Sequence, residues 1–153
     1  VYDPTLPDAS ASALGATKRP LAELLAECPV VSVHAPATPD TRKMLGAREF
    51  KLLPDGAVFI NTARSWVLDE DALLAELSTG RISAALDVFD REPVPADSPF
   101  RKLGNVIVTD HIAGATRQSR LRQGRLVADE ITRFIAGEPL RHAITRERFA
   151  IMA

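Results

Sequence analysis

Residues 57–89 have the sequence AVFINTARSWVLDEDALLAELSTGRISAALDVF, which predicts a strand, a helix and a second strand. The apolar runs at 57–61 and 82–89 have the length and composition of buried strands. Between them, Asp69 is a typical helix N-cap followed by an acidic first turn, and Gly80 ends the helix. A strand–helix–strand unit of this kind predicts two parallel strands joined by a crossover helix.

The same alternation continues on both sides of this unit. Strands are predicted at 1–3 (the end of a strand only), 30–34 and 106–109, and helices at 20–27, 41–53 (interrupted at Gly46) and 116–136. The tail from 138 to 153 is less regular and has room for one short helix. Apolar strands separated by helices predict an α/β fold with a doubly wound parallel sheet, covered on both faces, and a long C-terminal helix.

Composition excludes several classes of protein. The chain has 153 residues, 46% of them hydrophobic, and a net charge of −1, which argues against nucleic acid or an anionic membrane as the main partner. No apolar stretch is long enough to span a bilayer, and no secretory signal is present. The single cysteine, Cys28, excludes an internal disulfide and is expected to be a buried structural thiol. We therefore expect a cytoplasmic protein.

Polar or ionisable residues stand at the ends of the predicted strands. They are Asp3, His34, the segment from Thr62 through Ala63 to Arg64, Asp87 and His111. Because ligands of open α/β sheets bind beyond the carboxyl ends of the strands, these residues predict a site at one edge of the sheet.

Three segments then resemble the D-2-hydroxyacid dehydrogenase family. The first is Asn61-Thr62-Ala63-Arg64, followed by Val67, Asp69-Glu70 and Ala72-Leu73; the second is residues 85–93, ALDVFDREP; the third is residues 109–116, TDHIAGAT. They occur in the family's order, and the resemblance extends from Asp3 to about Leu140. It implies a Rossmann-like fold, with a partial NAD-binding domain at 1–115 and a helix and tail at 116–153 that return toward a substrate domain.

The resemblance implies a catalytic set of Arg64, Glu92 and His111. Arg64 has the planar guanidinium that binds a substrate carboxylate. His111 is the general acid–base for the hydroxyl proton, because imidazole titrates near neutrality. Glu92 would accept the second imidazole N–H and orient the ring. The implied activity is hydride transfer between NAD(H) and a small D-2-hydroxy or 2-oxo acid.

The cofactor contacts follow from the same resemblance. Asp3 would bind the adenosine ribose hydroxyls and, because a carboxylate repels a 2′-phosphate, favour NAD over NADP. Asp87 would meet the nicotinamide carboxamide. The remaining residues assigned to the dinucleotide groove are His34, Pro36, Thr62, Ala63, Arg64, His111, Ala113 and Gly114. No metal is expected, and the family implies a homodimer.

The sequence departs from the family pattern in three places. Ser65 replaces a glycine, Asp110 replaces a proline before the histidine, and Ala113 replaces a glycine. None of these changes removes a catalytic group.

Taken singly, each residue also has a structural interpretation. Arg64 could be a solvated arginine, Glu92 a loop carboxylate, His111 a satisfied core histidine and Asp3 a turn former; Trp66 could wall the site or simply pack. Their joint occurrence favours the enzyme. The alternative function is an NAD(H)-sensing binding protein, like the corepressors built on this scaffold, because fold alone does not separate the two.

The family's G-x-G-x-x-G loop is absent and is expected upstream of Val1. In the strand order 3-2-1-4-5-6, the chain would supply strands 3 to 6 and the tip of strand 2. Loss of central strand 1 would leave two facing edges with unpaired backbone groups. We therefore expect a broken sheet, a chain that is part of a longer polypeptide or is complemented by another chain, and no activity of the chain alone.

Overall fold

The computed structural model describes residues 1–149 and 152. In chain order its elements are α1 (Asp8–Ala13), α2 (Leu21–Glu27), β1 (Val30–Val33), η1 (Pro39–Thr41), α3 (Ala47–Leu52), β2 (Val58–Asn61), η2 (Ser65–Val67), α4 (Glu70–Ser78), β3 (Ser83–Leu86), η3 (Pro99–Lys102), β4 (Val106–Val108), α5 (Arg117–Ile135) and α6 (Arg146–Phe149).

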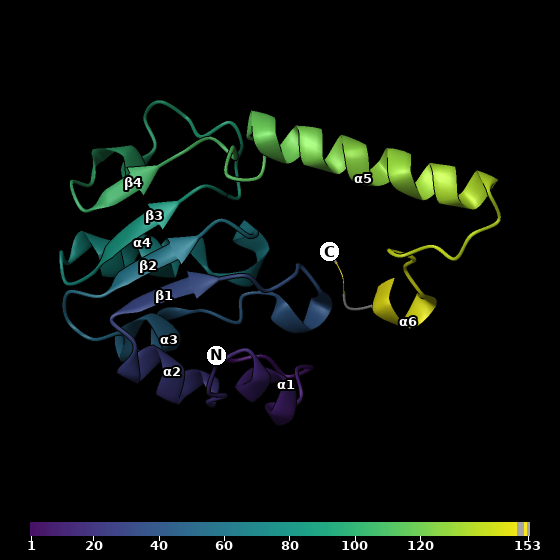
Figure 1. Cartoon of the computed structure of the whole chain (residues 1–153). Coiled ribbons are helices and arrows are strands. Elements are labelled where there is room, and N and C mark those ends of the chain that lie inside the picture. Colours follow the sequence, from purple (N-terminus) through teal and green to yellow (C-terminus); the bar gives the residue numbers. More distant parts are fainter. Residues whose placement is uncertain (150–151, 153) are drawn as a thin grey trace.

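The four strands form one parallel sheet in the order β1-β2-β3-β4 (Figure 1). Register is continuous, with Val30 beside Val58 and Val58 beside Ser83. The α/β class, the parallel sheet and the long C-terminal helix are therefore confirmed.

The predicted place of Val30–Val33 as strand 3 of the sheet is wrong. β1 pairs directly with β2 along its whole length, so no strand is missing between them. In the order 3-2-1-4-5-6, a run of strands that starts with a strand 3 would have strands 2 and 1 between it and strand 4, whereas strands from 4 onward lie side by side in chain order. β1 therefore corresponds to strand 4 rather than strand 3. In the order 3-2-1-4-5-6 the other neighbour of strand 4 is strand 1, so the expected place of strand 1 is beside β1, which within the described residues is an edge strand of the sheet.

The N-terminal segment also differs from its prediction. Residues 1–3 form no strand; instead the Val1 ammonium donates to the Thr17 carbonyl oxygen, and the Arg19 amide donates to the Val1 carbonyl oxygen. Val1 thus pairs with Thr17 and Arg19 rather than with the sheet. The short helix α1, between them, follows Pro7 and was not predicted.

One face of the sheet carries the core. The residues of β1, β2 and β3 that alternate onto this face are buried, and α3 contacts both α2 and α4 beside them. The rings of Phe50 and Phe59 meet edge to face at 5.4 Å, and Cys28 packs, half-buried, against the cluster. The opposite face is only partly covered, because Val30 is 57% and Ile107 67% exposed, so the expectation of cover on both faces is not met.

Local signals define the helix ends as predicted. Asp69 caps α4 by accepting the Ala72 amide, and Gly80 follows the helix with φ +75°, a conformation that glycine adopts without strain. Helix α5 begins next to Thr116, near which its start was predicted, and Thr116 also caps it by accepting the Ser119 amide, a role that was not predicted. Pro20, predicted at the first position of α2, is its N-cap instead.

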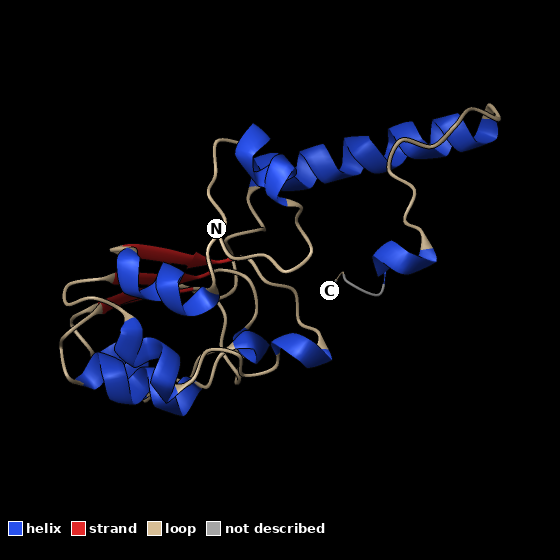
Figure 2. Ribbon diagram, turned by 90° about the horizontal axis from the view of Figure 1, so that it is seen from below, coloured by secondary structure: helices blue, strands red, loops and turns tan. Residues whose placement is uncertain are grey.

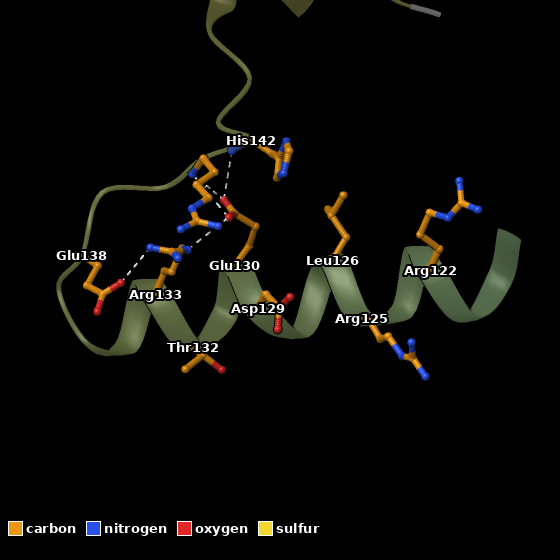
Figure 3. A pocket seen from close by; sticks show the side chains of 10 residues that line it. Arg122, Arg125, Leu126, Asp129, Glu130, Thr132, Arg133, Glu138 and His142 are labelled. Atoms are coloured by element: carbon orange, nitrogen blue, oxygen red, sulfur yellow. Dashed lines mark hydrogen bonds and ion pairs between the residues drawn. The ribbon is translucent and has the colours of Figure 1, made fainter. Parts of the chain in front are cut away.

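Helix α5 extends away from the sheet, and the tail folds back beside it (Figures 1 and 2). The carboxylate of Glu130 accepts the amides of Arg141 and His142, and Arg133 pairs with Glu138 at 2.8 Å (Figure 3). No residue of α5 is buried. None of the helices within 1–149 is long and apolar enough to cross a membrane.

Candidate active site

The predicted site residues gather at the carboxyl edge of the sheet. His34 follows β1, the segment from Thr62 to Arg64 follows β2, Asp87 follows β3, and His111 lies just after β4. Because the strands are parallel and adjacent, these segments meet at one edge (Figure 1). This edge is where α/β sheets bind ligands.

Glu92 and His111 form a direct pair. Glu92 Oε2 lies 2.8 Å from His111 Nδ1, while Oε1 accepts the Phe89 amide at 3.0 Å. The bond to His111, and then that to Phe89, lower the pKa of Glu92 below its usual range. The side chains of His111 and Glu92 remain 44% and 35% exposed, so the pair is ordered but open to a ligand.

The backbone of His111 is in the left-handed region, with φ +53°. This conformation is uncommon for residues other than glycine, and it persists where the surrounding structure holds it. Here the His111 amide donates to the Asp87 carbonyl oxygen at 2.8 Å. The loop therefore imposes the orientation in which the imidazole reaches Glu92.

Asp87 anchors the same loop. Its buried carboxylate, 2% exposed, accepts the Thr109 hydroxyl and the amides of Ile112 and Ala113, each amide at 2.9 Å. Burial raises the pKa of Asp87, but these hydrogen bonds outweigh burial, so that the pKa is lowered overall. Both carboxylate oxygens are thus engaged by segment 109–113, a role that the sequence did not indicate.

Asn61 holds the turn that carries Arg64. It is fully buried, donates to the Arg64 carbonyl oxygen and accepts the Ala63 amide, both at 3.0 Å. The exposed guanidinium of Arg64 donates to the Ala63 carbonyl oxygen at 2.7 Å. The sequence motif contains Asn61 but did not predict this role; its signal is a polar residue at the end of an apolar strand.

A cavity of about 380 Å³ opens beside the pair, lined by Phe89, Glu92, Pro93, Val94, Asp110 and His111. Asp110, which replaces the family's proline, pairs with Arg101 at 3.0 Å. A second hollow, of about 440 Å³, lies between α5 and the tail and is lined by none of the predicted site residues (Figure 3).

The loop after β1 is tied to the loop after β2 through Trp66. The indole N–H donates to the Thr38 carbonyl oxygen at 2.8 Å, and the Arg42 guanidinium lies 5.0 Å from the ring centroid. The indole thus bridges two loops at the site edge.

The residues assigned to the cofactor are arranged as follows. Asp3 Oδ1 accepts the hydroxyl and amide of Thr5, which lower the pKa of Asp3 and orient its carboxylate. His34 Nε2 lies 2.9 Å from the Ser32 hydroxyl. Thr62, Ala113 and Gly114 are exposed, whereas Pro36 and Ala63 are half-buried. Within the described residues, no group of three or more His, Cys, Asp or Glu side chains could hold a metal ion.

Glu70 was expected only as part of an acidic first turn. It is half-buried, and its Oε1 accepts the Asp90 amide at 2.5 Å, across 20 residues of sequence. Burial, together with the nearby carboxylates of Asp90, Asp71 and Glu92, raises the pKa of Glu70 from 4.5 to about 6.

This raised pKa predicts a pH-dependent cost to stability. Between pH 4.5 and 6 the folded chain binds more protons at Glu70 than the unfolded chain, so stability falls as pH rises through this window. The full cost would be roughly 2 kcal/mol, reduced by solvent screening to about 1 kcal/mol. Relative to wild type, the free energy of unfolding of the Glu70→Gln chain is therefore expected to rise by about 1 kcal/mol between pH 4.5 and 7.5. Urea denaturation of both proteins across this range measures the difference between their free energies of unfolding. A difference that does not change with pH would contradict the prediction.

The sequence is similar to a family model and to known dehydrogenases. Residues 1–113 match the model of the D-isomer specific 2-hydroxyacid dehydrogenase, NAD binding domain. The chain is 37% identical over 144 residues to the D-3-phosphoglycerate dehydrogenase of Archaeoglobus fulgidus, covering 94% of this chain and 27% of that protein. It is 38% identical over 135 residues to the glyoxylate reductase of Aeropyrum pernix, covering 88% of this chain and 40% of that protein.

Among solved structures, the D-lactate dehydrogenase of Lactobacillus jensenii with NAD⁺ superposes with a TM-score of 0.81 at 26% identity, covering 95% of this chain and 47% of that one. The chain thus spans between about a quarter and a half of the length of these relatives. With its three motifs, its sheet and its Glu92–His111 pair, the chain belongs to the D-isomer specific 2-hydroxyacid dehydrogenase family, and residues 1–113 are its NAD-binding domain.

Proposed function

We propose that the protein transfers a hydride between NAD(H) and a small D-2-hydroxy or 2-oxo acid. The observation that carries this proposal is the hydrogen bond between Glu92 and His111 at the carboxyl edge of the sheet, in a chain of this family. The proposed roles are His111 as general acid–base, Glu92 as the residue that orients it, and Arg64 as the substrate-binding cation.

The geometry supports a proton-transfer role for His111. Glu92 holds Nδ1, which leaves Nε2 for the hydroxyl or carbonyl oxygen of a substrate. The lowered pKa of Glu92 keeps this carboxylate ionised at neutral pH, where it stabilises an imidazolium. During reduction His111 gives a proton to the substrate oxygen, and during oxidation it takes that proton back.

Arg64 supports binding of the acid. Its exposed guanidinium stays protonated at any working pH and can bind a carboxylate through two parallel N–H donors. The buried Asn61 fixes the turn below it, so the side chain starts from a rigid backbone.

NAD is the proposed cofactor, and when bound it supplies the hydride. The donor set fits: Asp3 offers a carboxylate oriented by Thr5, and the exposed residues Thr62 and Gly114 border the sheet edge. We propose that Asp3 binds ribose hydroxyls, that Asp87 acts near the nicotinamide through the loop it anchors, and that His34, Pro36, Ala63 and Ala113 line the groove.

The carboxylate of Asp3 is expected to make the protein prefer NADH over NADPH. Asp3→Asn keeps an oxygen for Thr5 but removes the charge that repels a 2′-phosphate. We expect the ratio of kcat/KM for NADPH to that for NADH to rise about tenfold, which corresponds to about 1.4 kcal/mol. Asp8→Asn, which removes an exposed carboxylate, serves as the control. An unchanged ratio in Asp3→Asn would remove this residue from the cofactor site.

We propose that α5 and the tail, residues 116–153, contact a substrate-binding part of the same protein. Ile131, Phe134 and Ile135 on α5 are 54%, 73% and 79% exposed, and the relatives extend well beyond the matched region. Amide hydrogen exchange of α5 should be slower in the full-length gene product than in the 153-residue chain; equal rates would contradict this contact.

We also propose that the protein is a homodimer. A monomeric mass measured by light scattering would exclude this.

The decisive experiment follows NADH absorbance with glyoxylate or hydroxypyruvate, using the full-length gene product. Oxidation of NADH that depends on the 2-oxo acid supports the dehydrogenase. Tight NADH binding without turnover of either acid would instead support the NAD(H)-sensing alternative. The 153-residue chain alone is expected to give no turnover.

A further inference from the structure

The loop that carries Glu92 has little structure of its own. Residues 87–98 form neither helix nor strand, and the tip from Asp90 to Pro93 is exposed. The bond from the Phe89 amide ties Glu92 to a residue of the core, and on the far side of the tip Arg101 binds the carbonyl oxygens of Val94 and Pro95. A contact from outside the loop at the exposed tip itself would add to these in holding Glu92 beside His111.

Glu70 makes such a contact. It is the first residue of α4, and its Oε1 accepts the Asp90 amide, two residues before Glu92. An acidic first turn is usually explained by the helix dipole alone. Asp71, the next residue, fits that explanation because it is exposed, whereas Glu70 is half-buried and turned to the loop.

The base of α4 is itself held in place. Asp69 caps the helix and pairs with Lys43 at 3.0 Å, so Glu70 projects from an anchored helix end. A continuous path of contacts therefore runs from α4 through Glu70 to Asp90, and from Glu92 to His111.

We infer that Glu70 is a positioning residue for the Glu92–His111 pair, fixing through the Asp90 amide the loop that places Glu92 against His111. The importance of the Glu92–His111 pair for hydride transfer rests on the proposed function. The contact between Glu70 and the Asp90 amide does not depend on it.

The charges around Glu70 make this contact pH-sensitive. Asp71 faces it from α4, Asp90 and Glu92 face it from the loop, and Lys43 lies near Asp69 and Asp90. With the pKa of Glu70 raised to about 6, its ionised form prevails above that pH. Burial and the neighbouring carboxylates oppose this ionisation, so packing of the loop against Glu70 becomes less favourable as pH rises through about 6, although the ionised carboxylate still accepts the Asp90 amide.

The test uses NMR of the 153-residue chain without cofactor or substrate, between pH 4.5 and 8. In wild type the Asp90 amide should titrate with a midpoint near 6, the pKa of Glu70. In Glu70→Ala this titration should vanish, and the carboxyl carbon of Glu92 should titrate at higher pH than in wild type, because its bond to His111 is weakened. Asp71→Ala, which removes the same charge one residue away, should keep the Asp90 titration, with a lower midpoint because Asp71 helps to raise the pKa of Glu70, and should leave the Glu92 titration unchanged.

Glu70→Gln separates position from charge. The amide oxygen of Gln can still accept the Asp90 N–H, so the Glu92 titration should stay low while the Asp90 midpoint near 6 disappears. If Glu70→Ala leaves both Asp90 and Glu92 as in wild type, Glu70 is only a helix-end residue and the inference fails. If Glu70→Ala does not fold, the Glu70→Gln chain gives the test: an Asp90 amide that still titrates with a midpoint near pH 6 in that variant would also overturn the inference. Failure of NADH turnover would overturn the proposed function and leave these signals unchanged.

Discussion

Replacing His111 by asparagine is expected to lower kcat for 2-oxo acid reduction by about 10²–10⁴-fold, the usual contribution of a positioned acid–base. Asparagine is the appropriate replacement because it tolerates a positive φ better than most residues, and His111 has φ +53°. The loop backbone should therefore survive while the proton donor is lost. Steady-state kinetics of the full-length gene product with NADH and hydroxypyruvate measure the effect.

The matched control is His142→Asn in the exposed tail. That side chain lies beside α5, away from the Glu92–His111 pair, and only its backbone amide binds Glu130 (Figure 3). We expect His142→Asn to keep wild-type kcat. NADH affinity of His111→Asn, measured by fluorescence, should stay within a few-fold of wild type. A kcat reduced less than tenfold would exclude His111 as the acid–base.

Replacing Arg64 by glutamine is expected to lower kcat/KM for the 2-oxo acid by about a hundredfold. Hydrogen bonds to charged groups contribute roughly 1.5–3 kcal/mol each, and a guanidinium makes two to one carboxylate. A loss of about 3 kcal/mol corresponds to about a hundredfold. Arg64→Lys should recover only part of this, because a lysine ammonium lacks the planar pair of donors.

Arg48→Gln is the control for Arg64. Arg48 is exposed on α3 and outside the residues assigned to the site, yet the substitution changes net charge equally. If Arg48→Gln and Arg64→Gln reduce kcat/KM by the same factor, the effect of Arg64 is a general effect of charge rather than binding of the acid.

The sequence predicted well those features that depend on local chemistry. Asp69 caps a helix through its own side chain, and Gly80 has the positive φ that its place after a helix suggests. The family was predicted from three linked motifs and is confirmed. Such features could be predicted because each depends on a few neighbouring residues.

Features that depend on contacts between distant segments were predicted less well. The strand count placed Val30 to His34 one position too early in the sheet, because pairing of β1 with β2 is a long-range choice that no local pattern encodes. The roles of Asp87 and Glu70 were missed for the same reason, since each side chain binds a loop about 20 residues or more away. The cytoplasmic location, the homodimer and the absence of a nucleic-acid partner stay predictions.

Deuterium transfer is the most direct test of the central claim that Arg64, Glu92 and His111 act on one small acid beside a nicotinamide. The full-length gene product is incubated with hydroxypyruvate and NADH deuterated at the transferable C4 position. The proposed function predicts glycerate of the D configuration with deuterium at C2, formed in step with NADH oxidation and at a much lower rate in His111→Asn. Glycerate without deuterium, glycerate of the L configuration, or NADH that binds and stays unoxidised would contradict it.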